Sequence, residues 1–192
     1  YLVASGNVGE LTTLDLPEAY EARAPDVVRR DDELGIRRAE GSMLDIPFED
    51  ASFDFVTSIS AIEHLDGDRT LHARDPDRHP RKTYEEYTRD TRRALDEMMR
   101  VVRPGGHVFV TTDAYVADRQ RTDTWSSPRG KGPIWSAYRY ETIEDVFLTS
   151  VRENGFELVG EPSYRVELLD DPDRSSYRGR WFTTFAIFAR RT

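Results

Sequence analysis

The sequence predicts an α/β fold with a mostly parallel sheet and helices on both faces. Short runs of β-branched and aromatic residues alternate along the chain with helix-forming stretches, which is typical of β-α-β units. In such sheets, ligands bind beyond the carboxyl ends of the strands. The chain has 192 residues, enough to bury one core, and it shows neither an internal repeat nor a second core. We therefore expect one domain over residues 1–192, with insertions at 66–82 and 113–140.

The first half of the chain contains three expected strands. Each is a short run of β-prone residues bounded by turn-forming residues, and they lie at 10–16, 36–40 and 52–58. Residues 1–5 are apolar and end at Gly6-Asn7, which is typical of a helix C-terminus. Residues 18–34 are charged and interrupted by Pro25, so a short helix and a loop are expected there.

The second half contains two expected helices and three expected strands. The first helix begins at Tyr84 and stops at Pro104-Gly105-Gly106, because apolar residues recur with helical spacing before that stop. The second begins at Thr142, where Asp145 completes the pattern of a capping box, and it ends at Asn154-Gly155. The strands are expected at 107–112, 156–159 and 181–189.

The composition excludes several classes of protein. The chain has no cysteine, so it contains neither disulfides nor thiolate metal ligands. No apolar run approaches the roughly 18 residues of a membrane helix, and a net charge of −9 argues against a general nucleic-acid binder. We expect a soluble, cytoplasmic protein without membrane or nucleic-acid partners.

Four segments carry a family resemblance. They are Leu14-Asp15-Leu16-Pro17, Gly41 to Phe48, Ser52 to Leu65 and Ala94 to Thr112. In their order and spacing they resemble the class I S-adenosylmethionine-dependent methyltransferases, in particular the type 11 methyltransferase domain. The resemblance implies a Rossmann-like fold and S-adenosylmethionine as cofactor. It also implies methyl transfer to a small-molecule acceptor with an oxygen, nitrogen or carbon nucleophile.

The resemblance implies a binding site for the ribose of the cofactor. Asp15 matches the carboxylate that, in the family, ends a strand and accepts hydrogen bonds from both ribose hydroxyls; Leu16 follows it in the same site. The alternative is that Asp15 only caps the helix that follows. Ile59 and Ser60, after another expected strand, would face the methionine part of the cofactor.

Adenine binding is where the chain departs from the family pattern. Ser42 stands where the family usually has an aspartate that meets the adenine amino group. A serine is shorter and neutral, so this contact is expected to be weaker or shared with water. Met43 is placed to pack on the adenine face, although a core position explains it nearly as well.

Candidate residues for the acceptor side follow the same resemblance. Glu63-His64 matches a pair common in the family, and His64 is placed to act as a general base. Alternatively it orders the loop by hydrogen bonding, because in-line methyl transfer does not strictly need a base. The aromatic insertion after residue 112, with Trp125, Trp135 and Tyr138, is expected to form a lid over the acceptor.

A metal site is an alternative for the polar insertion. Acidic and histidine side chains crowd there at His64, Asp66, Asp68, His72, Asp75, Asp77 and His79. Oxygen and imidazole ligands suit a divalent cation. The cluster lacks a recognised ligand spacing, however, and a solvated loop explains it more simply, so no metal is expected.

The chain also departs from the family at its start. The family's first strand and glycine-rich loop have no counterpart here, since Gly6-Asn7-Val8-Gly9 begins only 35 residues before Gly41. We expect an upstream segment in the natural protein, and poor cofactor binding by the chain from Tyr1 alone, because a missing central strand leaves both neighbours with unpaired edges. The other hypothesis is an inactive methyltransferase-like scaffold or partner subunit that has lost the cofactor loop.

Overall fold

The computed structural model describes residues 8–66, 82–115, 138, 142–160, 176–177 and 180–192. The chain forms two compact units, Tyr1–Glu49 and Asp50–Thr192, and each is described by itself. The expected helix at residues 1–5 and most of both expected insertions lie outside the described residues. The single domain over 1–192 stays a prediction.

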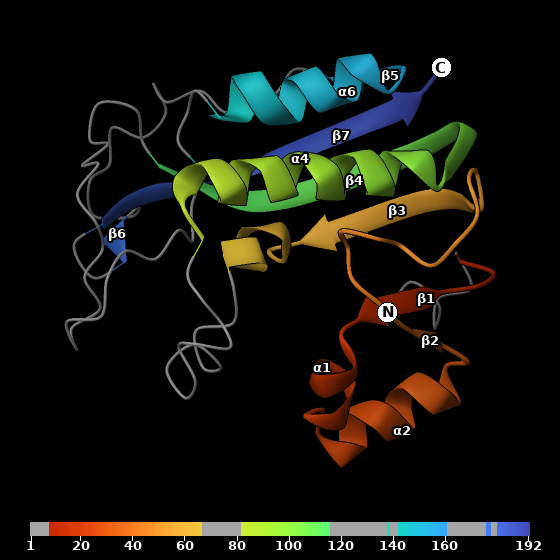
Figure 1. Cartoon of the computed structure of the whole chain (residues 1–192). Coiled ribbons are helices and arrows are strands. Elements are labelled where there is room, and N and C mark those ends of the chain that lie inside the picture. The colour runs from red at the N-terminus through yellow and green to blue at the C-terminus, as the bar shows by residue number, and fades with distance from the viewer. Residues whose placement is uncertain (1–7, 67–81, 116–137, 139–141, 161–175, 178–179) are drawn as a thin grey trace. The chain divides into compact units, whose positions relative to one another are not determined.

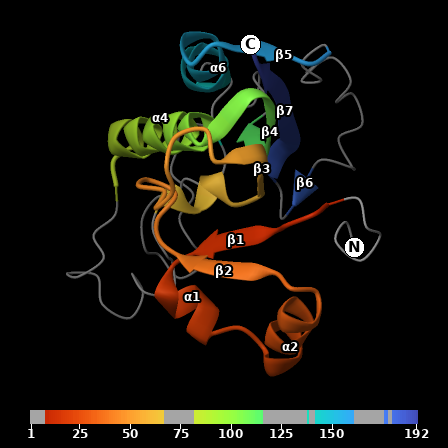
Figure 2. The same ribbon diagram turned by 90° about the vertical axis from the view of Figure 1, so that its right-hand side faces the viewer.

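The first unit is a parallel strand pair with two short helices. The pair consists of β1 (Thr12–Asp15) and β2 (Arg37–Glu40), in a register that sets Asp15 opposite Glu40. Helices α1 (Pro17–Glu21) and α2 (Pro25–Glu33) connect the strands and lie on one side of the pair (Figure 2). The expectation of one helix and a loop was therefore wrong. Pro25 begins a second helix rather than breaking the first, because the missing N–H and fixed φ of proline suit the first helical turn.

The second unit is built on a mixed five-stranded sheet (Figure 1). Its order is β3 (Phe53–Ile59), β4 (Val102–Tyr115), β7 (Arg180–Arg191) and β5 (Phe156–Leu158), with β6 (Ser176–Tyr177) also paired to β7. The β3–β4 pair is parallel, whereas the three pairs that involve β7 are antiparallel. All six strands expected from the sequence are present, and the α/β prediction is confirmed.

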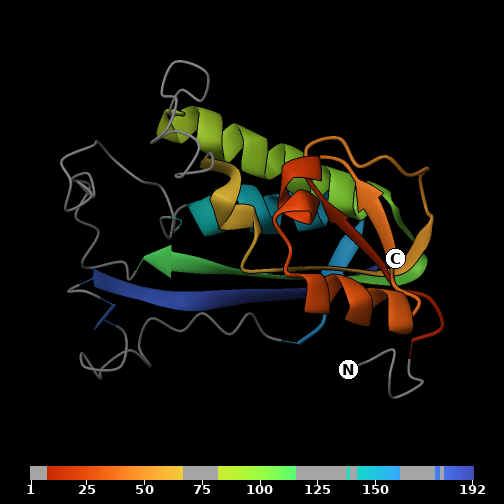
Figure 3. The ribbon, with the colours of Figure 1, turned by 90° about the horizontal axis from the view of Figure 1, so that it is seen from below.

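Helices of the second unit pack on one face of this sheet. Helix α4 (Tyr84–Arg100), the π-helical η3 (Ile143–Leu148) and α6 (Thr149–Glu153) lie on the same side of β4 and β7 (Figure 3). A short 3₁₀ helix, η1 (Ile62–Asp66), follows β3. The core between helices and sheet is apolar, and its fully buried members include Leu95, Met99, Val108, Val110, Phe147 and Phe185.

The Pro104-Gly105-Gly106 segment is structural, as expected, but it does not end the helix. Helix α4 already ends at Arg100, and β4 begins at Val102 with a register shift against β3 before His107. A Cβ on Gly106 would lie 2.7 Å from the Asp54 carbonyl oxygen, so the close approach of the two strands requires glycine there.

The predicted capping box at Thr142 and Asp145 was wrong. Thr142 has helical dihedral angles and caps no amide; its hydroxyl instead lies 2.7 Å from the hydroxyl of Tyr84. The capping box of this unit lies at the start of α4. There the Thr83 hydroxyl accepts from the Glu86 amide at 3.1 Å, and the Glu86 carboxylate accepts from the Thr83 amide at 2.7 Å.

One edge of β1 and one edge of β3 have no strand partner among the residues that the structure describes. β1 pairs only with β2, and β3 pairs only with β4. The expected missing central strand stays a prediction.

We predict that Thr83→Ala lowers the free energy of unfolding by about 1 kcal/mol at pH 7, as for other lost N-caps. The hydrogen bonds from Thr83 lower the pKa of Glu86, so their stabilisation is present at neutral pH and is lost as pH falls through that lowered pKa. Urea unfolding at pH 7 and at acid pH measures both effects. Thr88→Ala, in the same helix, is the control and should cost less; equal costs would refute the cap.

Candidate functional site

The carboxylate of Asp15 ends strand β1. Its Oδ1 accepts a hydrogen bond from the Leu16 amide at 2.9 Å, and its Oδ2 lies 3.8 Å from the guanidinium of Arg23. The side chain is 43% exposed, so part of its acceptor capacity faces solvent. Leu16 is half exposed beside it.

Arg23 is fixed mainly by groups other than Asp15. It donates to Asp31 of α2 at 2.8 Å, and its guanidinium lies 4.5 Å from the centre of the Tyr20 ring. The Tyr20 hydroxyl in turn donates to the Thr13 carbonyl of β1 at 2.7 Å. Because Asp31 holds Arg23 more closely than Asp15 does, Asp15 keeps oxygen atoms for another donor.

The chain that follows β2 turns directly beside the end of β1. The Gly41 amide donates to the Asp15 carbonyl at 3.0 Å, and Leu14 and Pro47 pack so closely on Gly41 that a Cβ there would lie about 3.0 Å from both. The Ser42 hydroxyl accepts from the Leu44 amide at 3.1 Å. The structure therefore brings Ser42 close to the strand end that carries Asp15, with Met43 half buried after it.

In the second unit, strand β3 ends at Ile59, and Ser60 follows it. Ile59 is 65% exposed, and Ser60 has φ +47°, the left-handed region that residues other than glycine rarely adopt. The Ser60 amide donates to both the carbonyl and the hydroxyl of Thr111, at 3.1 and 3.2 Å. Backbone strain of this kind, held by neighbouring hydrogen bonds, is common at functional sites.

His64 lies on η1 with an exposed side chain. No described residue forms a hydrogen bond or an ion pair with its imidazole, although its amide donates to the Ala61 carbonyl at 3.0 Å. The suggestion that His64 orders the loop by side-chain hydrogen bonding thus finds no partner in the described part of the chain. The exposed imidazole is available to exchange a proton with a ligand.

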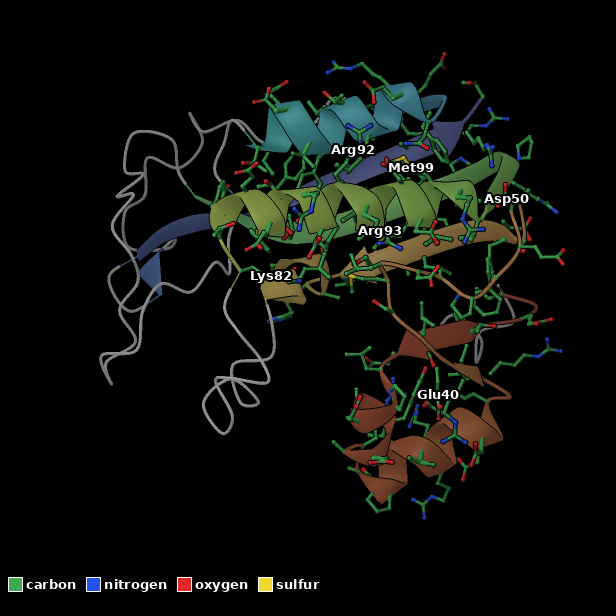
Figure 4. All side chains as sticks on the ribbon, viewed as in Figure 1. Glu40, Asp50, Lys82, Arg92, Arg93 and Met99 are labelled. Carbon is green, nitrogen blue, oxygen red and sulfur yellow. The ribbon has the colours of Figure 1, made fainter. Side chains whose placement is uncertain are left out.

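Other side chains hold the η1 turn by binding its carbonyl groups. The hydroxyls of Tyr138 and Tyr87 donate to the carbonyls of Ile62 and Glu63, at 3.0 and 3.2 Å. The ammonium of Lys82, which precedes α4, donates to the Leu65 carbonyl at 2.6 Å (Figure 4). These bonds fix the backbone on both sides of His64.

Glu63 belongs to the Glu-His pair expected from the sequence, but the sequence reasoning assigned a role only to His64. Its side chain is buried, with 3% exposed, and its Oε2 accepts from the Thr112 hydroxyl of β4 at 3.2 Å. A charged residue between the apolar Ile62 and the exposed His64 gives no periodic signal, so only the packing shows that it faces the core. Glu63 ties η1 to β4.

Tyr138 is fully buried, and both its ring and its hydroxyl contact other described residues. Its ring stacks on Tyr87 at 4.9 Å and meets Phe147 edge-on at 4.9 Å, and its hydroxyl lies 2.9 Å from that of Thr91. This burial raises the pKa of the Tyr138 hydroxyl, which therefore stays protonated.

Trp125 and Trp135 lie outside the described residues, so an acceptor lid that includes them stays a prediction. The same is true of the acidic and histidine cluster beyond His64. Within the described part of the chain, no group of histidine and carboxylate side chains is placed to hold a metal ion. No helix of that part is long and apolar enough to cross a membrane.

A sequence profile described as "Methyltransferase domain" matches residues 1–110, which is more than half of the chain. The chain belongs to the methyltransferase domain family. A comparison of this methyltransferase domain with curated proteins gives no match.

Solved structures similar to this methyltransferase domain confirm the predicted Rossmann-like methyltransferase fold. Geranyl diphosphate C-methyltransferase from Streptomyces coelicolor A3(2) is 14% identical, with a TM-score of 0.58, over 100% of this chain and 66% of that one. A SAM-dependent methyltransferase from Methanosarcina mazei is 12% identical, with a TM-score of 0.53, over 95% and 82%. The [4+2]-cyclase SpnF is 18% identical, with a TM-score of 0.56, over 95% and 66%.

We predict that Tyr138→Phe lowers the free energy of unfolding by about 1–3 kcal/mol, because the buried Ile62 carbonyl loses its donor. Chemical unfolding of the methyltransferase domain measures the loss. Tyr84→Phe is the control, since its hydroxyl pairs with Thr142 in a partly buried position and should cost less. A smaller effect for Tyr138 than for Tyr84 would contradict the role of this hydroxyl in holding η1.

Proposed function

We propose that this protein transfers a methyl group from S-adenosylmethionine to a small-molecule acceptor. The observation that carries the proposal is the half-exposed carboxylate of Asp15 at the carboxyl end of β1. One of its oxygens uses a lone pair for the Leu16 amide, and the remaining lone pairs suit two hydroxyl donors from a ribose. Family membership over residues 1–110 supports the same cofactor.

The residues expected from the family resemblance keep their proposed roles. In the first unit, Asp15 and Leu16 would hold the ribose, and Ser42 and Met43 the adenine. In the second, Ile59 and Ser60 would lie against the methionine part. The cofactor, when bound, supplies a methyl group on a positively charged sulfur. The protein orients the acceptor for in-line attack, and positioning alone provides much of the rate of such a displacement.

His64 is the residue proposed to handle the proton. Its imidazole is exposed, while the backbone around it is fixed by Tyr138, Tyr87 and Lys82. A neutral imidazole accepts the proton that an oxygen or nitrogen acceptor loses as its bond to the methyl group forms.

A small organic acceptor fits the acidic net charge of the chain better than a nucleic acid does. We also propose that the protein is cytoplasmic.

A second candidate function is a methyltransferase-like protein without methyl transfer. The observation that favours it is the similarity to SpnF, which is described as a [4+2]-cyclase although methyltransferases share the fold. A partner subunit without activity falls in the same class. Cofactor binding with no S-adenosylhomocysteine formed from any small-molecule acceptor would favour this second candidate.

We predict that Asp15→Ala weakens binding of S-adenosylmethionine by about 1–3 kcal/mol, because the ribose hydroxyls lose their acceptor. Isothermal titration calorimetry on the natural protein measures the affinity. Asp26→Ala, which removes an exposed carboxylate from α2, is the control and should leave the affinity unchanged. If both variants bind as tightly as the wild type, Asp15 does not belong to the site.

We predict that His64→Gln lowers kcat about 10²-fold for an oxygen or nitrogen acceptor and leaves cofactor affinity unchanged, as for the loss of a general base. The assay follows S-adenosylhomocysteine production with a panel of small phenols, amines and carboxylic acids. An unchanged kcat would assign His64 to the surface.

A further inference from the structure

Adenine recognition needs an acceptor for the exocyclic amino group, and Ser42 is poorly equipped to be that acceptor. Its hydroxyl is neutral, and it already accepts the Leu44 amide at 3.1 Å. A charged acceptor makes a hydrogen bond roughly twice as strong as a neutral one. A carboxylate in the same turn after β2 would be a stronger acceptor than the Ser42 hydroxyl.

The backbone of this turn sets Asp45 directly opposite Ser42. The two residues form an antiparallel bridge, in which the Asp45 amide donates to the Ser42 carbonyl at 3.0 Å, and Met43 and Leu44 form the bend between them. Residues paired in this way carry their side chains on the same face, with Cβ atoms about 4.5–5.5 Å apart. The Asp45 side chain thus leaves the backbone beside that of Ser42.

Asp45 has a free carboxylate on a well-held turn. Its side chain is exposed and has no hydrogen bond or ion pair with any residue that the structure describes. The next residue, Ile46, is buried with 8% exposed. Gly41 on the other side is packed against Leu14 and bonded to the Asp15 carbonyl. The carboxylate is therefore exposed on a turn that is held, through Gly41, beside the end of β1 where Asp15 lies.

We propose that Asp45 binds the adenine amino group of the cofactor and supplies the carboxylate that Ser42 lacks. The inference rests on the proposed use of S-adenosylmethionine and names a specificity residue of that site. A carboxylate only accepts hydrogen bonds, so Asp45 favours a purine with an amino group at C6 over a purine with a carbonyl oxygen at the same position. A carbonyl oxygen at C6 would lie against the Asp45 carboxylate with no hydrogen to share, so the two oxygens would repel each other.

The test compares two ligands in calorimetry on the natural protein: S-adenosylhomocysteine and S-inosylhomocysteine, which carries a C6 carbonyl. The wild type should prefer the adenosine compound. Asp45→Asn should bind it about tenfold more weakly, which corresponds to the loss of one charge-assisted hydrogen bond. The ratio of the two affinities should also decrease, because the asparagine amide can donate a hydrogen bond to the C6 carbonyl of the inosine compound. Asp26→Asn is the control for a general loss of negative charge in the first unit.

A second variant tests the assignment by moving the carboxylate. Ser42→Asp in the Asp45→Asn background should restore the affinity and the preference for adenine. An aspartate at position 42 can still accept the Leu44 amide, so the turn is kept. Thermal unfolding shows that each variant is folded.

Two different results would overturn the inference, and only one of them would also overturn the proposed function. If the wild type binds S-adenosylhomocysteine while Asp45→Asn keeps its affinity and its preference, Asp45 is not the adenine acceptor, and the proposed function stands. If the folded wild type does not bind S-adenosylhomocysteine at all, the proposed function is wrong and this inference falls with it.

Discussion

Parallel pairing of strands is the constraint on which the candidate site depends. In a parallel pair, both strands end at the same edge, so the chain leaves both ends side by side. The register of β1 and β2 sets Asp15 opposite Glu40, and the bond from the Gly41 amide to the Asp15 carbonyl extends that pairing by one residue. Two turns that are 25 residues apart in the sequence thereby present Asp15 and the Ser42–Asp45 bridge together. An antiparallel pair would have placed them at opposite edges.

In the second unit, buried polar side chains hold the backbone of the candidate site around His64, whereas in the first unit strand pairing holds it. Peptide carbonyls in η1 have few partners within so short a helix, and an unpaired buried carbonyl is costly. The hydroxyls of Tyr87 and Tyr138 satisfy two of them from inside the core. The Glu63 carboxylate accepts a hydrogen bond from the Thr112 hydroxyl in the same core. A histidine on such a turn has a mobile side chain on a fixed backbone, which suits a proton acceptor.

Local signals in the sequence predicted most elements of the fold, because strand-forming runs and helical periodicity are local properties. The start of α4 and the apolar residues that it buries followed from spacing, whereas the helix ends at Arg100, before the expected stop at Pro104-Gly105-Gly106. The failures share a cause: a local sequence pattern does not show which distant residue a side chain will bind. Thr142 has the residue type of an N-cap, yet its hydroxyl pairs with Tyr84, 58 residues away. Likewise, the burial of Glu63 depends on its contact with Thr112 of β4, and the bridge that aligns Asp45 with Ser42 depends on the backbone of the turn.

The open edges of β1 and β3 have a consequence for the behaviour of the protein in solution. Each edge is a row of amide donors and carbonyl acceptors with no strand against it among the described residues. Such a row accepts any extended chain in suitable register, including a strand of a second molecule. Neither edge carries a proline, the residue that would block pairing most directly. The net charge of −9 opposes such pairing by electrostatic repulsion between molecules, and added salt weakens this repulsion.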